Sequence, residues 1–328
     1  MRLARIALLS LTGLVACGGS ASPTAPNTTA TTTTTTTTST APTPVYVVLF
    51  THIEDNTPTG TIGDAITRTN YLRTRQSVID MATLARRYSV KWVLQPDWKF
   101  LLAALAYEDA SMTSSTGGVN VLRYLRDTMG VAIDAHSHEN FGYNYTDVAY
   151  LLDQLGVGGT TVIGGHVWDP SLPQFQNWDR FRSAQSGQTY PSARWRGDIL
   201  MGAGTPNHVN DPTVSGVWHP KDRNNFFTDD PTGNIVSVGQ FKGDVDGITE
   251  LNALARAGTI ASTCMKTASI HLLPSTLTST SGLASVESTY VAPIAALGSS
   301  QAVTTDFTSL VATWRSSFGG RGCTYIPR

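Results

Sequence analysis

The chain has 328 residues, of which 14% are charged, and its formal net charge at pH 7 is −1. This balance argues against the basic surface by which proteins bind nucleic acid. Beyond residue 16 no apolar stretch reaches the length of about 20 residues that a membrane-spanning helix needs. Residues 45–328 are long enough to form one large domain with a substantial core.

The amino terminus predicts export. Two arginines, Arg2 and Arg5, precede an apolar run over residues 6–16, which is the pattern of a signal peptide. The run ends in Leu-Val-Ala-Cys, which resembles the bacterial lipobox and implies that Cys17 is lipidated. Because Gly18 rather than Asp follows the cysteine, an anchor in the outer membrane or on the cell surface is expected. The alternative is an ordinary signal peptide with a chance cysteine.

Three segments follow from these patterns. Residues 1–17 are the lipoprotein signal and lipobox, and residues 45–328 are the folded domain. Between them, residues 18–44 are mostly Gly, Ser, Ala, Pro and Thr, with threonine at every position from 31 to 38. Such a segment has too little apolar surface to offset the entropy of folding. It is therefore expected to be a disordered tether.

The two other cysteines are expected to form a disulfide. The chain has three cysteines, and assigning Cys17 to lipid leaves Cys264 and Cys323. In an oxidising compartment this pair would link the carboxyl-terminal tail to a late strand. Neither cysteine has neighbours in the sequence that suggest a nucleophile, so the predicted role is structural.

Strands and helices alternate along the domain. Apolar, β-branched runs predict strands at 45–50, 92–94, 131–135, 161–165, 199–201, 216–218, 235–238 and 267–270. Helical spacing predicts helices at 70–88, 99–108, 119–129, 146–155, 248–257 and 304–318. Repeated strand–helix units indicate a parallel sheet with outer helices. The expected fold is an α/β deformed (β/α)7-type barrel, interrupted by a loop-rich insertion at about 166–235.

The end of the 131–135 strand carries the most informative motif. Asp134, His136 and His138 alternate along the strand, so their side chains are expected to face the same way. In barrels and open α/β sheets, active sites form at this carboxyl end of the strands. Two imidazoles and a carboxylate suit a divalent metal. The alternative is a pair of histidines hydrogen-bonded to Asp134 at a polar strand end.

Further polar residues end three other predicted strands. Glu54 and Asp55 follow the first strand and could divide the work, one holding a metal and one taking a proton. His271 ends the last strand, although a histidine among apolar residues is more often a core residue. His166 and Trp168 follow the 161–165 strand and are candidates for a supporting or substrate-contacting role.

These motifs resemble those of the polysaccharide deacetylase (NodB-homology) group within the glycoside hydrolase and deacetylase barrel superfamily. That family has Thr-Phe-Asp-Asp after its first strand, and residues 51–55 are similar, with one extra residue and Glu54 in place of the first Asp. Its second motif, His-Ser/Thr-x-x-His, aligns its last histidine with His138 and its first with Asp134. Its late histidine matches His271. Every motif is degenerate, so the chain would be a divergent member.

The resemblance implies a metal-dependent hydrolase. A divalent metal, zinc above all, would be held by Asp55, His136 and His138, with Glu54 as general base and His271 as general acid. Asp134 would be a further ligand or a residue that orients an imidazole. The implied reaction is the hydrolysis of C–N or ester bonds in an acylated extracellular or cell-wall glycan.

Two other interpretations remain open. The stretch from Asp134 to His138 is also similar to the opening metal motif of amidohydrolases and PHP-type phosphoesterases, although that motif sits on the first strand there and is preceded by other strands here. The degenerate motifs also allow a non-catalytic glycan-binding lipoprotein, attached to the membrane only by its lipid. Metal content and esterase activity would separate a hydrolase from a binding protein.

Overall fold

The structure is a computed structural model that describes residues 43–166, 177–201 and 213–327. The predictions for Cys17 and Trp168 lie outside these residues. Within the described ranges, no helix combines the length and apolar character that crossing a membrane requires.

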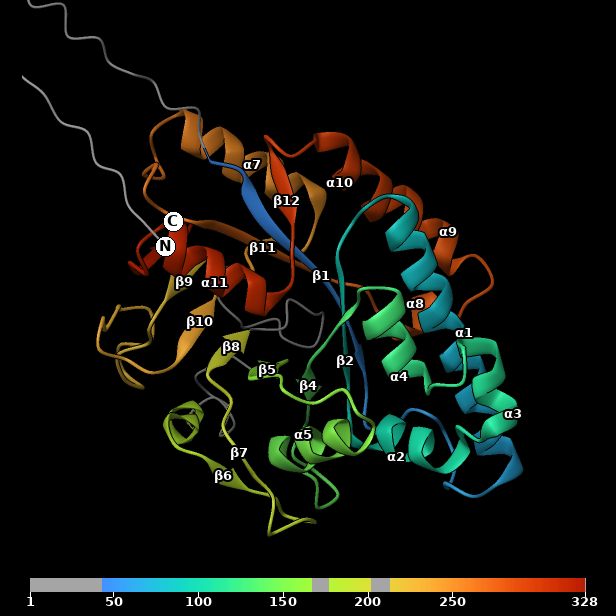
Figure 1. The fold of residues 1–328 in the computed structure, drawn as a ribbon. Helices are drawn as coiled ribbons and strands as arrows, with labels where there is room; N and C mark the ends of the chain where they lie inside the picture. Colours follow the sequence, from blue (N-terminus) through green and yellow to red (C-terminus); the bar gives the residue numbers. More distant parts are fainter. Residues whose placement is uncertain (1–42, 167–176, 202–212, 328) are drawn as a thin grey trace, which may run out of the picture. The chain divides into compact units, whose positions relative to one another are not determined.

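A mainly parallel set of strands forms the centre of the fold, with helices around it (Figure 1). The parallel strands are β1 (Val45–Ile53), β2 (Trp92–Pro96), β3 (Ala132–Ile133), β4 (Ala135–His136), β5 (Val162–Gly164), β8 (Ile199–Met201), β10 (Val236–Val238) and β11 (Lys266–His271). They pair in the order β11-β1-β2-β3 and β4-β5-β8-β10. Because β3 and β4 are separated only by Asp134, they continue one strand between β2 and β5.

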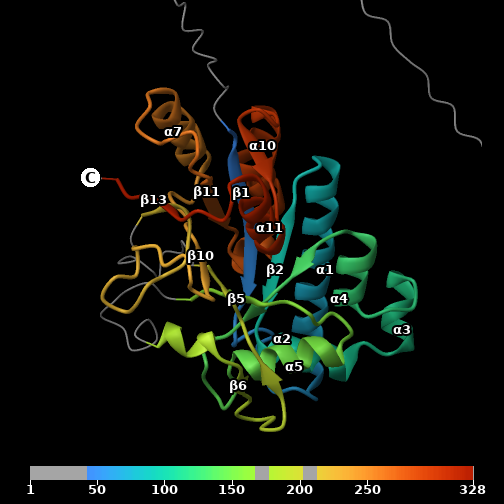
Figure 2. The same ribbon diagram turned by 60° about the vertical axis from the view of Figure 1, so that its left-hand side comes forward.

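The remaining strands complete the edges. β12 (Ala302–Thr304) pairs in parallel with β1, while β9 (Ser215–Trp218) and β13 (Cys323–Tyr325) add antiparallel strands beyond β10 (Figure 2). β6 (Gln185–Ser186) and β7 (Arg194–Trp195) form a separate antiparallel pair. These elements interrupt the simple strand–helix alternation that the sequence predicts.

Isolated backbone and side-chain hydrogen bonds, rather than a regular ladder, connect β11 to the strands on its other side. The Ser269 backbone N–H donates to the Gln240 carbonyl at 2.9 Å. The Thr267 hydroxyl donates to the carbonyl of Gly239 at 2.6 Å, and the Ser215 hydroxyl donates to the carbonyl of Thr267 at 2.9 Å. β11 therefore lies beside β9 and the end of β10, but the pairing there is irregular.

The helices lie outside the strands. They are α1 (Ala65–Arg87), α2 (Trp98–Tyr107), α3 (Ala110–Thr113), α4 (Val121–Arg123), α5 (Tyr145–Gln154), α7 (Val245–Arg256), α8 (Pro274–Leu277), α9 (Gly282–Val286), α10 (Ala292–Leu297) and α11 (Phe307–Ser317). Short 3₁₀-helices are η1 (Ser114–Thr116) and η3 (Trp178–Arg182), and short π-helical segments are η2 (Tyr124–Thr128) and η4 (Glu287–Val291). The described structure is thus mixed α/β, with parallel strands covered by helices.

The two faces of β1 pack in different apolar clusters. Val47 and Leu49 belong to the larger cluster, which includes residues of α1, α2 and α5. Val48 and Phe50 belong to a smaller cluster with residues of β2, β5, β8 and β10. Side chains alternate along a strand, so the positions after Phe50 on its face are 52 and 54. This parity directs His52 and Glu54 to the inner side.

Most predicted elements are confirmed, and the differences have local causes. α1 begins at Ala65, before the predicted start at 70, and the predicted 304–318 helix begins at Phe307. Asp306 fixes that second boundary because its carboxylate accepts a hydrogen bond from the Ser309 N–H at 2.7 Å. Helices α8 to α10 were not predicted, since residues 274–297 are rich in Ser, Thr and Ala and show little apolar periodicity.

The expected disulfide joins Cys264 to Cys323, with a Cα–Cα distance of 5.6 Å. It links the segment just before β11 to β13 across 59 residues of sequence. Replacing both cysteines by serine should lower the free energy of unfolding by about 4 kcal/mol, because the unfolded chain regains the entropy of that loop. Urea denaturation of the two proteins measures the loss. An unchanged midpoint and slope would show that the bond has no stabilising role.

Candidate functional site

The carboxyl ends of β1 and β4 bring a carboxylate between two imidazoles. Glu54 directly follows β1, and His136 is the last residue of β4. Glu54 Oε2 lies 3.2 Å from His136 Nε2 and 3.2 Å from His138 Nε2. The neighbouring carboxylate of Asp55 reaches the other side of His138, with Oδ2 at 3.4 Å from Nδ1. Residues 82 positions apart in sequence therefore meet at one end of the parallel strands.

The hydrogen bonds of His136 fix its orientation and its tautomer. Its Nδ1 lies 3.1 Å from the Gly164 carbonyl, which also accepts a 2.7 Å hydrogen bond from the Tyr145 hydroxyl. A carbonyl only accepts, so Nδ1 must carry a proton. Nε2 then faces Glu54 Oε2, and this contact is attractive only if a proton or a cation lies between the two atoms. Metal-binding histidines usually have this arrangement, with the second ring nitrogen donating to a carbonyl.

His138 faces carboxylates with both ring nitrogens. Its hydrogen bond with Glu54 raises the pKa of the imidazole to about 9, and the charges of Glu54 and Asp55 contribute while partial burial opposes the shift. Burial would raise the pKa of Glu54, but its hydrogen bonds with His136 and His138 outweigh that effect and hold the pKa well below its usual range. At neutral pH and without a metal, the pair is a carboxylate beside an imidazolium.

His52 completes a group with metal-ligand composition. Within the described part of the chain, ligand atoms of His52, Glu54 and His136 all lie within 4.8 Å of one another. Zn–N and Zn–O distances near 2.1 Å place tetrahedral ligands about 3.4 Å apart, which is close to the 3.2 Å between Glu54 and His136. Two histidines and a glutamate are also a known ligand set of catalytic zinc. The donor chemistry therefore fits a zinc-type ion.

The stacking of His52 on His136 limits how these rings can bind one ion. Their centroids are 3.9 Å apart and their planes differ by 14°. Parallel rings have nearly parallel nitrogen lone pairs, so a rotation of one ring is needed for both to point at one ion. Glu54 and His136 need no such change.

Gly165 lets the chain pass close to this histidine pair. Its φ is +72°, and a Cβ at this position would lie 2.6 Å from the His136 ring and 2.9 Å from that of His52. A side chain here would therefore be strained and would displace both imidazoles.

Gly165→Ala should consequently impair the site more than the fold. We expect at least a tenfold loss of metal affinity with a destabilisation of about 1–2 kcal/mol. Gly159→Ala is the matched control, because Gly159 also has a positive φ, of +98°, but a Cβ added there would have no neighbour within 4 Å. Calorimetric metal titration and urea denaturation measure the two effects. Equal losses of metal affinity in both variants would contradict the steric argument.

Asp97 is a site residue that the sequence analysis missed. It follows β2, is fully buried, and accepts hydrogen bonds from the backbone N–H groups of Trp98 at 2.6 Å and His138 at 3.3 Å. Burial raises the pKa of this carboxyl to about 6, although His136 and the two backbone N–H groups oppose the shift. Asp97 thus ties the loop that carries His138 to the start of α2. Its place directly after a buried strand and before a helix was the available sequence signal.

A cavity of about 610 Å³ opens over these residues. Its volume is within the range of small-molecule sites. Its lining combines these carboxylates and imidazoles with residues of the 56–59 loop, of α1 and of the start of α8. The lining residues are His52, Glu54, Asp55, Asn56, Thr57, Pro58, Thr59, Asn70, Arg73, Thr74, His136, His138, Leu273, Pro274, Ser275 and Thr278.

The predicted ligand set only partly matches the geometry. His136 and His138 converge as predicted, and Asp55 meets His138. However, Glu54 is the carboxylate between the two imidazoles, and the tightest ligand group contains His52 rather than Asp55 or His138. The reason is strand parity, since His52 and Glu54 share the inner face of β1. Asp55 instead follows on the other parity and accepts a hydrogen bond from the Asn140 side chain.

Asp134 accepts a 2.7 Å hydrogen bond from the Thr160 hydroxyl, and the Gly164 carbonyl is the group that faces Nδ1 of His136. The expectation that Asp134 is a ligand or orients an imidazole therefore stays a prediction. Ile133 and Ala135 pack in the larger cluster, which lies between the strands and the helices. Asp134 therefore points to the other face of the strand, the inner face that it shares with His136. It lies one pleat deeper, about 6–7 Å along the strand.

The remaining candidates lie around the cavity without lining it. His271 ends β11 and packs against Phe50 and His52, with ring centroids 5.0 and 4.7 Å away. His166 is buried and lies edge-on to Phe181 at 6.4 Å. His138, in contrast, lines the cavity and has a pKa raised to about 9.

Comparisons with known proteins add one likeness of fold. No protein-family profile matches the sequence, and no curated protein matches it. Among solved structures, the chain is similar to the crystal structure of PuuE allantoinase, with a TM-score of 0.47 and 10% sequence identity over 83% of this chain and 91% of that one. At this level of similarity the comparison assigns no activity, so function must be argued from the site.

Proposed function

We propose that this protein is a metal-dependent hydrolase with His52, Glu54 and His136 as its ligands. The observation that carries the proposal is the Nε2 of His136, which faces Glu54 Oε2 at 3.2 Å while Nδ1 is committed to the Gly164 carbonyl. A buried imidazole held in this way is prepared to bind a cation between itself and the carboxylate. The parallel strand order and the irregular contact between β10 and β11 support a deformed (β/α)7-type barrel as the scaffold.

The proposed cofactor is zinc, which when bound lowers the pKa of a coordinated water and polarises a carbonyl group. His138 is the proton donor for the leaving group, because it lines the cavity and its two ring nitrogens face the carboxylates of Glu54 at 3.2 Å and Asp55 at 3.4 Å. Asp55 orients this imidazole through Nδ1, and the Asp97 carboxylate fixes its backbone. His138 therefore takes the role of general acid that the resemblance suggested for His271.

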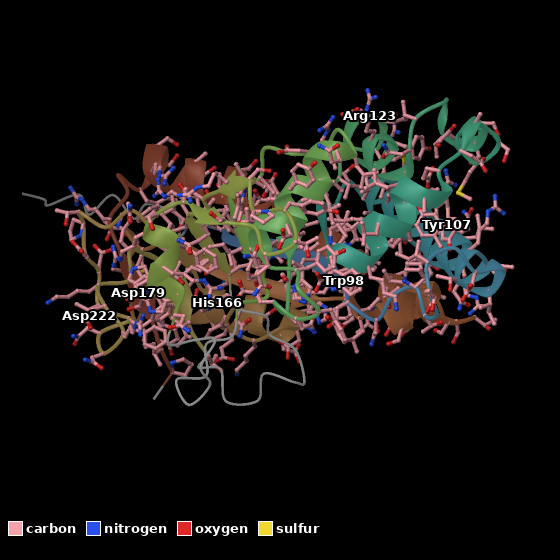
Figure 3. All side chains as sticks on the ribbon, turned by 90° about the horizontal axis from the view of Figure 1, so that it is seen from below. Trp98, Tyr107, Arg123, His166, Asp179 and Asp222 are labelled. Carbon is pink, nitrogen blue, oxygen red and sulfur yellow. A yellow bond between two sulfur atoms is a disulfide. The ribbon has the colours of Figure 1, made fainter. Side chains whose placement is uncertain are left out.

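The proposed substrate is an N- or O-acylated glycan outside the cell. The degenerate deacetylase motifs support the acyl group, and the aromatic surface beside the site supports a sugar. Trp98, which lies at the start of α2 (Figure 3), stacks on Tyr143 with a centroid distance of 4.6 Å, and Phe141 is 77% exposed. Export and the predicted lipid on Cys17 would place the protein in the bacterial cell envelope. Release of a soluble Cys17→Ser variant from the membrane fraction would test the anchor.

The same aromatic surface also favours a second candidate, a glycan-binding lipoprotein without catalysis. Exposed aromatic rings can bind sugars with no metal or proton transfer. The two candidates differ in what the Glu54–histidine cluster does. A binding protein keeps its glycan affinity when that cluster is altered, whereas a hydrolase loses turnover.

Metal titration and hydrolysis of acylated substrates by matched histidine variants test the proposal. Wild-type protein should bind one zinc ion and hydrolyse p-nitrophenyl acetate or acetylated chito-oligosaccharides. His136→Ala and His52→Ala should lower zinc affinity by at least tenfold, while His138→Ala should retain zinc and lose about 100-fold or more in turnover. A wild-type protein that binds no divalent metal would refute the hydrolase and leave the glycan-binding protein.

A further inference from the structure

Three residues of α1 line the cavity together with the histidines. Asn70, Arg73 and Thr74 lie at positions i, i+3 and i+4, so they share one face of the helix and all line the cavity. Asn70 is engaged with the neighbouring loop, because its amide donates to the side chain of Thr59 at 2.7 Å and to its carbonyl at 3.2 Å. Arg73 is thus held on a helix whose position relative to the 56–59 loop is fixed.

Among the described ion pairs, three arginines of α1 have an acidic partner and Arg73 has none; Arg86 also lacks one, but it lines a different pocket beside Met129. Arg68 pairs with Asp109 at 3.6 Å, Arg75 with Glu108 at 2.7 Å and Arg87 with Glu287 at 2.6 Å. Across the described residues, no ion pair includes the guanidinium of Arg73. Its side chain is therefore an uncompensated positive charge on the cavity wall.

The cavity is lined by charges of both signs. Glu54 and Asp55 come from the end of β1 and Arg73 comes from α1, and within the described residues no ion pair joins Arg73 to either carboxylate. The two carboxylates would repel a carboxylate of the substrate, whereas the guanidinium would attract it. Guanidinium groups bind carboxylates through two parallel N–H donors, so the contact is directional as well as electrostatic.

We propose that Arg73 binds a carboxylate of the substrate, and that the protein acts on acidic acylated saccharides such as uronic acid derivatives. This inference rests on the proposed hydrolase function, whose substrate class it makes more specific. The Arg73 contact would orient the sugar so that its acyl group reaches the Glu54–histidine cluster. The hydroxyl of Ser275 on α8 also lines this cavity and can contact the sugar ring.

Binding of two sugars that differ by one carboxylate tests the inference. N-acetylglucosamine and N-acetylglucosaminuronic acid differ only in a hydroxymethyl group that becomes a carboxylate. Ligand-observed NMR titration of the full-length protein, with zinc and separately with EDTA, should give at least tenfold tighter binding of the acid, as a charge-assisted contact supplies. Arg73→Gln should abolish this preference, and Arg73→Lys should restore part of it.

Arg68→Gln is the matched control, because Arg68 lies on the same helix but outside the cavity lining. It should leave the preference unchanged. Equal binding of the two sugars by the wild type, or a preference that survives in Arg73→Gln, would overturn the inference. Neither result bears on whether the wild type binds zinc and hydrolyses acyl groups. The experiment can therefore refute the acidic-saccharide substrate without refuting the metal-dependent hydrolase.

Discussion

Glu54→Gln should lower zinc affinity by about two orders of magnitude while leaving the fold intact. The carboxylate is the shared contact of His136 and His138 and a member of the tightest ligand group. An amide of the same size removes its negative charge and most of its strength as a zinc ligand. Calorimetric zinc titration measures this loss, and circular dichroism checks the fold.

The same variant has a second readout without metal. The hydrogen bond with Glu54 is the largest cause of the raised pKa of His138, so Glu54→Gln should move that pKa down from about 9 toward 6.5. NMR titration of the imidazole in EDTA follows this shift. The matched control is Glu250→Gln, the same change at an exposed residue that pairs with Lys242. Zinc affinity and a His138 pKa that both stay at wild-type values in Glu54→Gln would show that Glu54 does not organise the cluster.

The fold was largely predictable because its strands are buried on both faces. Continuous apolar runs such as residues 45–50 and 199–201 predict inner strands, and the structure places β1 and β8 there. The short helices at 274–297 were not predictable in the same way. Their Ser, Thr and Ala residues carry little apolar periodicity, and tertiary contacts determine where they begin and end.

Part of the site was predictable from the alternation of side chains along a strand. This alternation brings His136 and His138 to one cluster, as the structure shows. Applied to β1, the same rule selects His52 and Glu54 in preference to Asp55. The resemblance to the deacetylase motif favoured Asp55 because that motif ends in two adjacent acids. Local parity was therefore the better guide than the motif.

Other features of the site depend on long-range contacts, which neither strand alternation nor the deacetylase motif can predict. Gly165 approaches two rings from β1 and β4, and Asp97 binds the backbone of a residue 41 positions away. Such contacts depend on how three strands and two loops meet, which no short stretch of sequence encodes. Asp97 and Gly165 each had a recognisable local pattern, but only the fold gives these patterns a role at the site.

Asp134→Asn should stabilise the metal-free protein at pH 8. Asp134 is buried, and burial raises its pKa from 3.8 to about 7 although the hydrogen bond from Thr160 opposes the shift. Between about pH 4 and pH 7 the unfolded chain carries this carboxylate ionised while the folded protein keeps it neutral. The contribution of Asp134 to the free energy of unfolding therefore falls as pH rises through this window, by up to about 1.4 kcal/mol per pH unit.

Asparagine keeps the oxygen that accepts from Thr160 and cannot ionise, so it removes this loss. The variant should match the wild type near pH 4 and exceed its free energy of unfolding by a few kcal/mol, roughly 4 at most, at pH 8. Urea denaturation in EDTA at pH 4, 6 and 8 gives the three differences. Thr160→Val is an informative companion, because loss of the hydroxyl donor should raise the pKa of Asp134 further and extend the loss of stability to higher pH. A variant Asp134→Asn that is less stable than the wild type at pH 8 would mean that the buried carboxylate is ionised and compensated by its surroundings.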